Sequence, residues 1–462
     1  MKKLLGRILY FFLLAVLIGA VIYAWPRLPI ITAFAAKGMC SCVFIADRDP
    51  ESVANQDLSF FPISLATTKV NYDDKSATAT LLGLVKRKAI YREGLGCAVV
   101  ADFPEEDIRE QSLPAIPELL YKSDITTWPL GDLLPDSIIP GLDYDKLEQI
   151  VTDAFDEPGS EPFKKSQAVV VIYDNNIVAE KYAEGFDMFT ECLGWSMAKS
   201  VTSTLVGILV KDGKLNIYET TGIEEWQNDE RSTITLNNLL HMNAGLQWVE
   251  NYFDLSEVTR MLYMKGDMYE YTLHSPLIYK PDSVFCYSSG IANIISGIIR
   301  KTINDDDIYH SFPYSRLFHR IGMRNTVFET DPAGTFTGSS YCFATPRDWA
   351  RFGMLYLNNG VFEGDTILPD WWVKYTTTPA NGSAGIYGAQ FWLHHHDEFP
   401  DVPEDMYFCD GFKGQRIFII PSKKLVVVRM GYSLENMHMN EFLRNIIATL
   451  PEEDLTTEVL EI

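Results

Sequence analysis

The pattern of apolar and polar residues sets one long uncharged segment apart from a much longer stretch of short, mixed elements. Residues 8–25 are eighteen positions without a charge, and at about 1.5 Å per residue such a helix just spans the roughly 30 Å hydrocarbon core of a bilayer. Lys2, Lys3 and Arg7 precede it, and basic residues of this kind stay on the cytoplasmic side. The pattern therefore predicts a membrane anchor within residues 1–37. The rest of the chain would lie outside the cytoplasm, in the periplasm if the cell is bacterial.

A cleaved signal peptide is the alternative interpretation of this segment. Signal peptides have apolar regions of roughly 7–15 residues, and the small-residue pattern Ala33-Phe-Ala35 lies well beyond the apolar run. We favour the uncleaved anchor, and we expect Pro26 and Pro29 to end its helix.

The seven cysteines fit an exported protein better than a metal site, because the sequence contains no Cys-x-x-Cys pair. We expect one or two disulfides, with Cys97 paired to either Cys40 or Cys42. The odd number leaves at least one thiol unpaired within the chain, and a buried, unreactive cysteine is its expected state.

The sequence of residues 38–139 predicts a small β-rich region followed by a connector. Apolar runs at 42–46, 77–84 and 97–101 predict short strands. Many prolines and turn residues follow over 104–140, which is typical of an ordered connector that wraps the next domain. The sequence therefore predicts a domain boundary near residues 130–140, with the next domain beginning at 140.

The stretch 140–450 has strand pairs at both ends and helices between them. The expected elements are a helix at 144–155, strands at 168–173 and 177–182, a buried helix at 196–210, helices at 236–241, 291–300 and 346–358, strands at 416–420 and 425–430, and a helix at 440–450. A short acidic tail is expected over 451–462.

Composition and charge narrow the class of protein. The chain has 462 residues, 47% of them hydrophobic and 22% charged, so most of it must fold. Its formal net charge is −23, although the first 37 residues hold five basic residues and no acidic one. A body this acidic repels phosphate backbones, so nucleic acid is excluded as a partner.

The sharpest candidate chemistry is Ser196-Met-Ala-Lys199 at the start of the buried helix. Residues three apart share one helix face, so the hydroxyl and the amine lie within reach of each other. Burial favours the neutral amine, which can take the serine proton as the oxygen attacks a carbonyl. The alternative is a capping serine beside a lysine whose stem packs on apolar surface.

Two further segments carry candidate residues. Tyr287 lies in a loop that leads into a helix and is suited to moving a proton to a leaving group, or it is simply a packed aromatic residue. Residues 410–416 open the last strand pair, where glycines allow a substrate to lie close to the backbone N–H of Gln415. The alternative there is an ordinary glycine-rich turn.

Taken together, Ser196-x-x-Lys199, Tyr287-Ser-Ser289 and Gly411-Phe-Lys-Gly414-Gln415 resemble the motifs of the penicillin-recognising serine hydrolases. The resemblance is to the class C β-lactamase-related branch, which includes 6-aminohexanoate-dimer hydrolases and related esterases. It extends to 233–246, 338–353 and 387–392 and covers about 140–450. The fold that it implies is α+β, an antiparallel sheet flanked by helices with a helical domain from the middle of the chain.

By this likeness Ser196 would be acylated, and Lys199 and Tyr287 would transfer protons. The N–H groups of Ser196 and Gln415 would form the oxyanion hole, and Ser289, Gly414 and Phe412 would line the substrate site. The resemblance implies neither a metal nor another cofactor.

Position 412 departs from the pattern of the β-lactamases. They carry a cation where this chain has Phe412, and strand alternation is expected to send Lys413 to the opposite face. We therefore expect a linear amide, peptide or ester substrate rather than a β-lactam.

The sequence thus predicts a membrane-tethered serine hydrolase that forms an acyl-enzyme on Ser196. The alternative is a relative with the same fold that acts as a sensor or ligand-binding protein and deacylates slowly or not at all.

Overall fold

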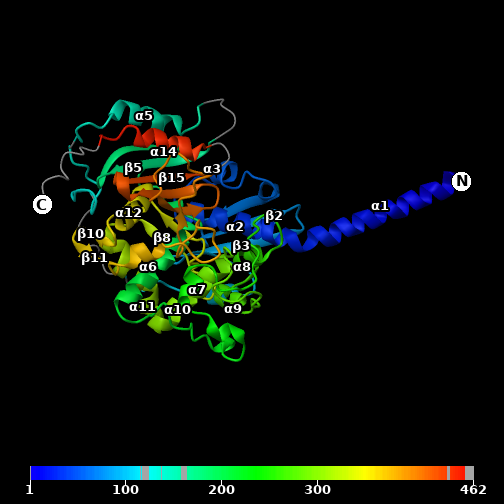
Figure 1. The fold of residues 1–462 in the computed structure, drawn as a ribbon. Helices are drawn as coiled ribbons and strands as arrows, with labels where there is room; N and C mark the ends of the chain where they lie inside the picture. Colours follow the sequence, from blue (N-terminus) through cyan, green and yellow to red (C-terminus); the bar gives the residue numbers. More distant parts are fainter. Residues whose placement is uncertain are drawn as a thin grey trace.

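A computed structural model describes residues 2–114, 116, 124–136, 138–157, 164–433 and 437–452, so most of the expected acidic tail lies outside the described residues. Helix α1 (Lys2–Ala24) extends away from the folded body (Figure 1). By length and composition, the helical stretch Leu4–Phe44 could cross a membrane, and its most apolar part is not buried against the body.

Pro26 and Pro29 do not interrupt the helical turns that continue from α1 into helix α2 (Leu28–Phe44). They lie at the starts of the 3₁₀ turn Trp25–Arg27 and of α2, where the missing N–H of a proline is not needed. The prediction of a strand at 42–46 is therefore wrong, because residues 42–44 end α2 and residues 45–46 form the turn that follows it. An apolar run that is buried on all sides has no periodicity to separate strand from helix.

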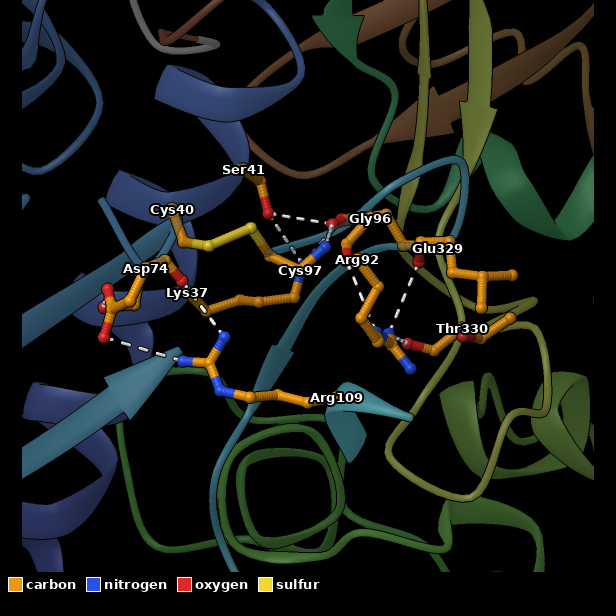
Figure 2. Close-up of a disulfide and its surroundings, with 12 residues drawn as sticks. Lys37, Cys40, Ser41, Asp74, Arg92, Gly96, Cys97, Arg109, Glu329 and Thr330 are labelled. Atoms are coloured by element: carbon orange, nitrogen blue, oxygen red, sulfur yellow. Dashed lines mark hydrogen bonds and ion pairs between the residues drawn. A yellow bond between two sulfur atoms is a disulfide. The ribbon is translucent and has the colours of Figure 1, made fainter. Parts of the chain in front are cut away.

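Helix α2 packs on a four-stranded antiparallel sheet of β1 (Thr67–Asn71), β2 (Ser76–Leu81), β3 (Val85–Arg92) and β4 (Gly96–Val99), in that order. The strands expected at 77–84 and 97–101 correspond to β2 and β4, whereas β1 and β3 were not expected. The disulfide joins Cys40 of α2 to Cys97 of β4 (Figure 2). Of the two partners that the sequence allows for Cys97, the structure thus has Cys40. Cys42 is a buried free thiol.

A buried polar cluster beside the disulfide joins this region to the rest of the chain (Figure 2). The carboxylate of Glu329 accepts hydrogen bonds from Lys37 Nζ at 2.6 Å, Ser41 Oγ at 2.9 Å and the Cys97 N–H at 2.6 Å. The boundary expected between residues 37 and 38 therefore falls inside a packed helix.

The main sheet has six antiparallel strands in the order β12-β13-β14-β15-β5-β6. Its strands are β5 (Ser166–Tyr173), β6 (Asn176–Tyr182), β12 (Trp392–Leu393), β13 (Tyr407–Gly411), β14 (Gln415–Ile420) and β15 (Leu425–Gly431). Both hairpins expected from the sequence are present, and β15 pairs with β5 to join the two ends of the domain.

Helices cover both faces of this sheet. One face packs against α5 (Tyr144–Asp153) and α14 (Met439–Ile447), and the other packs against α12 (Pro346–Leu357) and α6 (Met197–Lys211). The expected α+β architecture is confirmed (Figure 1).

The middle of the chain supplies most of the remaining elements. They are α3 (Pro50–Gln56), α4 (Glu105–Arg109), α7 (Leu236–Leu240), α8 (Glu257–Met264), α9 (Met268–Leu273), α10 (Ser289–Ile303), α11 (Asp306–Pro313), α13 (Trp372–Thr376), β7 (Cys192–Leu193), β8 (Thr326–Phe328), β9 (Cys342–Ala344), β10 (Val361–Phe362) and β11 (Asp365–Thr366).

Candidate active site

Ser196 stands at the N-terminus of α6, directly after a tight turn. Trp195 adopts a left-handed backbone conformation with φ 48°, which is strained for a bulky residue. This turn leaves Ser196 half-buried, whereas Lys199 one helical turn later is 1% exposed. A strained turn that leads a serine out of the core is a frequent feature of catalytic sites.

The amine of Lys199 contacts three oxygen atoms. Its Nζ lies 2.9 Å from Ser196 Oγ, 3.0 Å from Ser289 Oγ and 2.9 Å from the carbonyl oxygen of Ser339. Burial lowers the pKa of Lys199 to about 8, and the negative charges of Glu250 and Asp410 oppose the shift. About a tenth of the amine is therefore neutral at pH 7, far more than for an ordinary lysine.

The directions of these hydrogen bonds follow from the partners. The Ser339 carbonyl can only accept, and the Ser289 hydroxyl donates to Glu250 Oε1 at 2.5 Å, so its oxygen accepts from Lys199. A neutral amine has two N–H groups, and these two acceptors use both. Its lone pair is then left to face the Ser196 hydroxyl, which is the arrangement that a base needs.

Glu250 was not identified from the sequence. It lies in the loop between α7 and α8, and its Oε2 accepts from the Ser289 N–H at 2.9 Å and from Trp248 Nε1 at 2.5 Å. It is 39 residues from Ser289 along the chain, so no local spacing could have linked the two. The only signal was an acidic residue within a markedly aromatic stretch, Trp248–Phe253.

We expect Glu250→Gln to lower kcat by roughly ten- to hundredfold, because a hydrogen bond to a charged group contributes about 1.5–3 kcal/mol. The negative charge of Glu250 raises the pKa of Lys199, so its removal lowers that pKa. Lys199 acts as a base only above its pKa, and the acid limb of the kcat/KM profile should therefore move to lower pH. Glu257→Gln in α8 is the control, and an unshifted limb in Glu250→Gln would contradict the coupling.

Tyr287 lies beneath the same amine. Its ring centroid is 4.7 Å from Lys199 Nζ, and the ring packs against Tyr387 and Trp392. Burial raises the pKa of Tyr287 well above its usual value, and a hydrogen bond with the Ser196 side chain acts in the opposite direction. Tyr287 therefore holds its proton at neutral pH.

The turn between β13 and β14 brings the third motif to the site. A Cβ at Gly411 would lie 2.2 Å from the carbonyl oxygen of Gly194, so only glycine lets this strand approach the residues before Ser196. Lys413 and Gly414 both have positive φ and form the turn itself. The expectation that strand alternation orients Lys413 is therefore wrong, because Lys413 is not in a strand.

Hydrogen bonds with residues of the neighbouring strand β15 fix the positions of Gln415 and Gly414. The Gln415 side chain exchanges hydrogen bonds with the backbone of Gly431, and its Oε1 accepts at 2.9 Å. Arg429, which is fully buried, donates from Nη1 to the Gly414 carbonyl at 3.0 Å. Arg429 was not identified from the sequence, although an arginine within an otherwise apolar strand was a visible signal.

Phe412 is part of an aromatic cluster beside the site. Its ring stacks on Tyr252 with centroids 5.0 Å apart and meets Trp195 edge-on at 5.3 Å. Lys413 Nζ lies 4.7 Å from the ring centroid of Phe60 and 5.5 Å from that of Phe412. The side chain at position 412 is thus surrounded by aromatic rings, with the Lys413 ammonium beside it.

The structure brings the sequence-predicted residues to one place. Lys199 contacts both Ser196 and Ser289, Tyr287 lies against the Lys199 amine, and Gly411 of the turn lies beside Gly194. Among the described residues, no group of three or more His, Cys, Asp or Glu side chains is arranged to hold a metal ion.

Comparison with known proteins agrees with this geometry. The sequence model of the beta-lactamase family matches residues 161–443. The 6-aminohexanoate-dimer hydrolase of Paenarthrobacter ureafaciens is 22% identical over 321 residues, which cover 63% of this chain and 75% of that protein.

Solved structures show the same fold. A putative 6-aminohexanoate-dimer hydrolase from Bacillus anthracis has a TM-score of 0.56 at 20% identity and covers 73% of this chain and 90% of its own. A family VIII carboxylesterase has a TM-score of 0.54 at 13% identity, covering 68% of this chain and 99% of its own. The family match spans more than half of the sequence, and the chain therefore belongs to the beta-lactamase family of serine hydrolases.

Proposed function

We propose that this enzyme is anchored in a membrane by α1 and cleaves amide or ester bonds through an acyl-enzyme on Ser196. The observation that carries the proposal is the buried Lys199 amine, 2.9 Å from the Ser196 hydroxyl, with a pKa of about 8. A base with a pKa near the working pH is the effective kind.

In the proposed first step, Ser196 Oγ bonds to the substrate carbonyl carbon and its proton passes to Lys199 Nζ. The N–H groups of Ser196 and Gln415 stabilise the negative oxygen that forms. Tyr287 protonates the leaving amine or alkoxide, and the Lys199 ammonium restores the tyrosine proton. Water then attacks the acyl-enzyme by the reverse proton path, which releases the acid and regenerates Ser196.

Labelling of the full-length protein with a fluorophosphonate probe tests this proposal. We expect one label per chain, located on the peptide that contains Ser196, and a matching loss of ester hydrolysis. A fluorescent penicillin that labels and then fades within minutes after a chase would indicate turnover. A label that persists would point to a slowly deacylating sensor, and no label with either probe would count against both.

The surroundings of Phe412 favour a neutral substrate. A charge-assisted hydrogen bond to a substrate carboxylate is worth about 1.5–3 kcal/mol, or roughly ten- to hundredfold in affinity. We expect the wild type to prefer a neutral ester over its carboxylate-bearing analogue, and Phe412→Lys to narrow that preference by roughly tenfold. An unchanged ratio of kcat/KM for the matched pair would contradict this role of position 412.

We expect the full-length protein in the membrane pellet after carbonate washing, because α1 presents its apolar side chains outward. A chain that begins at Trp25 keeps α2 intact and should stay in the supernatant. External protease should digest the body in spheroplasts while a cytoplasmic marker survives. Full-length protein in the soluble cytosol would contradict the anchor and its orientation.

A further inference from the structure

An apolar groove of about 370 Å³ lies between the foot of α1 and the active site. This volume is within the roughly 300–1,000 Å³ of small-molecule sites. Its walls are almost entirely hydrocarbon and aromatic, and they include Tyr23, Ile31, Phe61, Leu65 and Phe253. The charged residues in its lining are Arg27 and Asp254, which pair with each other at 2.8 Å.

The outer rim of the groove exposes large apolar side chains. Phe61, Leu65 and Phe253 are 75%, 53% and 64% exposed, and a contiguous apolar patch of this kind marks an interaction site. Arg27 ties the foot of α1 to the loop that carries Phe253, and its guanidinium also lies over the Tyr23 ring at 3.6 Å. Because the rim lies at the foot of α1, it is at the surface of any bilayer that α1 spans.

The inner end of the groove borders the catalytic groups. It is formed by the stacked pair Tyr252 and Phe412. The Tyr252 hydroxyl hydrogen-bonds to Glu250 Oε1 at 3.3 Å. Phe412 follows Gly411, which lies against the residue two before Ser196. The groove thus extends from the surface beside α1 to the aromatic pair Tyr252 and Phe412, which lies next to Glu250 and Gly411 of the catalytic site.

We propose that the groove binds the hydrocarbon chain of the substrate, so that the enzyme acts on amphiphilic esters or amides drawn from the membrane. This inference rests on the proposed function, because it assumes turnover at Ser196. A chain in the groove covers the apolar rim that water would otherwise contact, and it places the polar carbonyl at the inner end beside Ser196. Burial of one methylene group is worth roughly a factor of four in affinity.

The test uses the full chain in phosphatidylcholine nanodiscs and p-nitrophenyl esters from acetyl to octanoyl below their critical micelle concentrations. We expect kcat/KM to rise at least about tenfold from acetyl to octanoyl. Leu65→Glu and Phe253→Glu place a charge on the rim at exposed positions, and each should remove most of that rise. Leu133→Glu is the control, because Leu133 is 49% exposed and lies outside the groove. A second series of alkyl acetates shows whether the chain belongs to the acyl or to the leaving group.

The outcomes separate the two proposals. If no ester is cleaved and no fluorophosphonate label forms, the proposed function fails. If short esters are cleaved but neither series depends on chain length, the proposed function stands and the groove does not bind the substrate chain. A rise that survives in both rim variants also overturns the inference, because the chain then binds elsewhere.

Discussion

Replacement of Ser196 by alanine should lower ester hydrolysis by roughly 10³- to 10⁶-fold and leave the protein folded. Loss of a catalytic nucleophile has effects of this size, and the residual rate comes from binding and the oxyanion hole alone. A capping serine that is lost usually destabilises a protein by about 1 kcal/mol. In the part of the chain described here, the Ser196 side chain makes no capping hydrogen bond to α6, so even this loss should be smaller.

Initial rates and the thermal unfolding midpoint measure the two halves of this prediction. Ser203→Ala is the matched control, since Ser203 lies two turns further along α6 and its hydroxyl donates to the backbone carbonyl of Ala389 at 3.2 Å. A Ser196→Ala variant that retains a tenth of the wild-type rate with a normal midpoint would remove Ser196 from the mechanism.

Replacement of Lys199 should be nearly as damaging, by roughly 10²- to 10⁴-fold, which is the contribution of a general base. The informative variant is Lys199→Arg, because a guanidinium keeps the charge and the hydrogen-bond donors but does not become neutral in proteins. Lys199→Met removes the charge and keeps a similar length. If Lys199 is a base, both variants lose activity and both fail to react with a fluorophosphonate.

An active Lys199→Arg variant would show that the position needs only a positive charge. Solubility and circular dichroism of Lys199→Met serve as the folding control, because this change leaves Ser289 Oγ and the Ser339 carbonyl without their buried donor. If soluble Lys199→Met keeps the wild-type rate, Lys199 is structural.

The parts of the site that could be predicted are those encoded over short distances. Ser196 and Lys199 share a helix turn. The turn at Gly414 and the strand that begins at Gln415 are indicated by an apolar run next to glycines. Glu250 and Arg429 reach the site only through tertiary packing, and nothing in their local sequence fixes what they contact. The resemblance to a known family supplied the link between motifs some 90 residues apart, which spacing alone does not provide.

The parts of the fold that were missed share another cause. Helix α2 is buried on nearly every side, so it lacks the polar stripe from which helical periodicity is recognised. Strand β1 alternates exposed and half-buried positions and has no apolar run. Strand β3 carries charged residues at half of its positions, which weakens the apolar signal of a strand. Their registers are set instead by the neighbours that they pair with.

The Lys37–Glu329 contact also has a consequence for how the chain is made. The two residues are 292 positions apart, and at roughly 5–20 residues per second the ribosome needs about 15–60 s to pass from one to the other. During that interval the first hundred residues, including both cysteines of the disulfide, have already been synthesised. The Glu329 carboxylate that pairs with Lys37 has not. The amino-terminal region therefore lacks this buried ion pair until the second half of the protein has been synthesised.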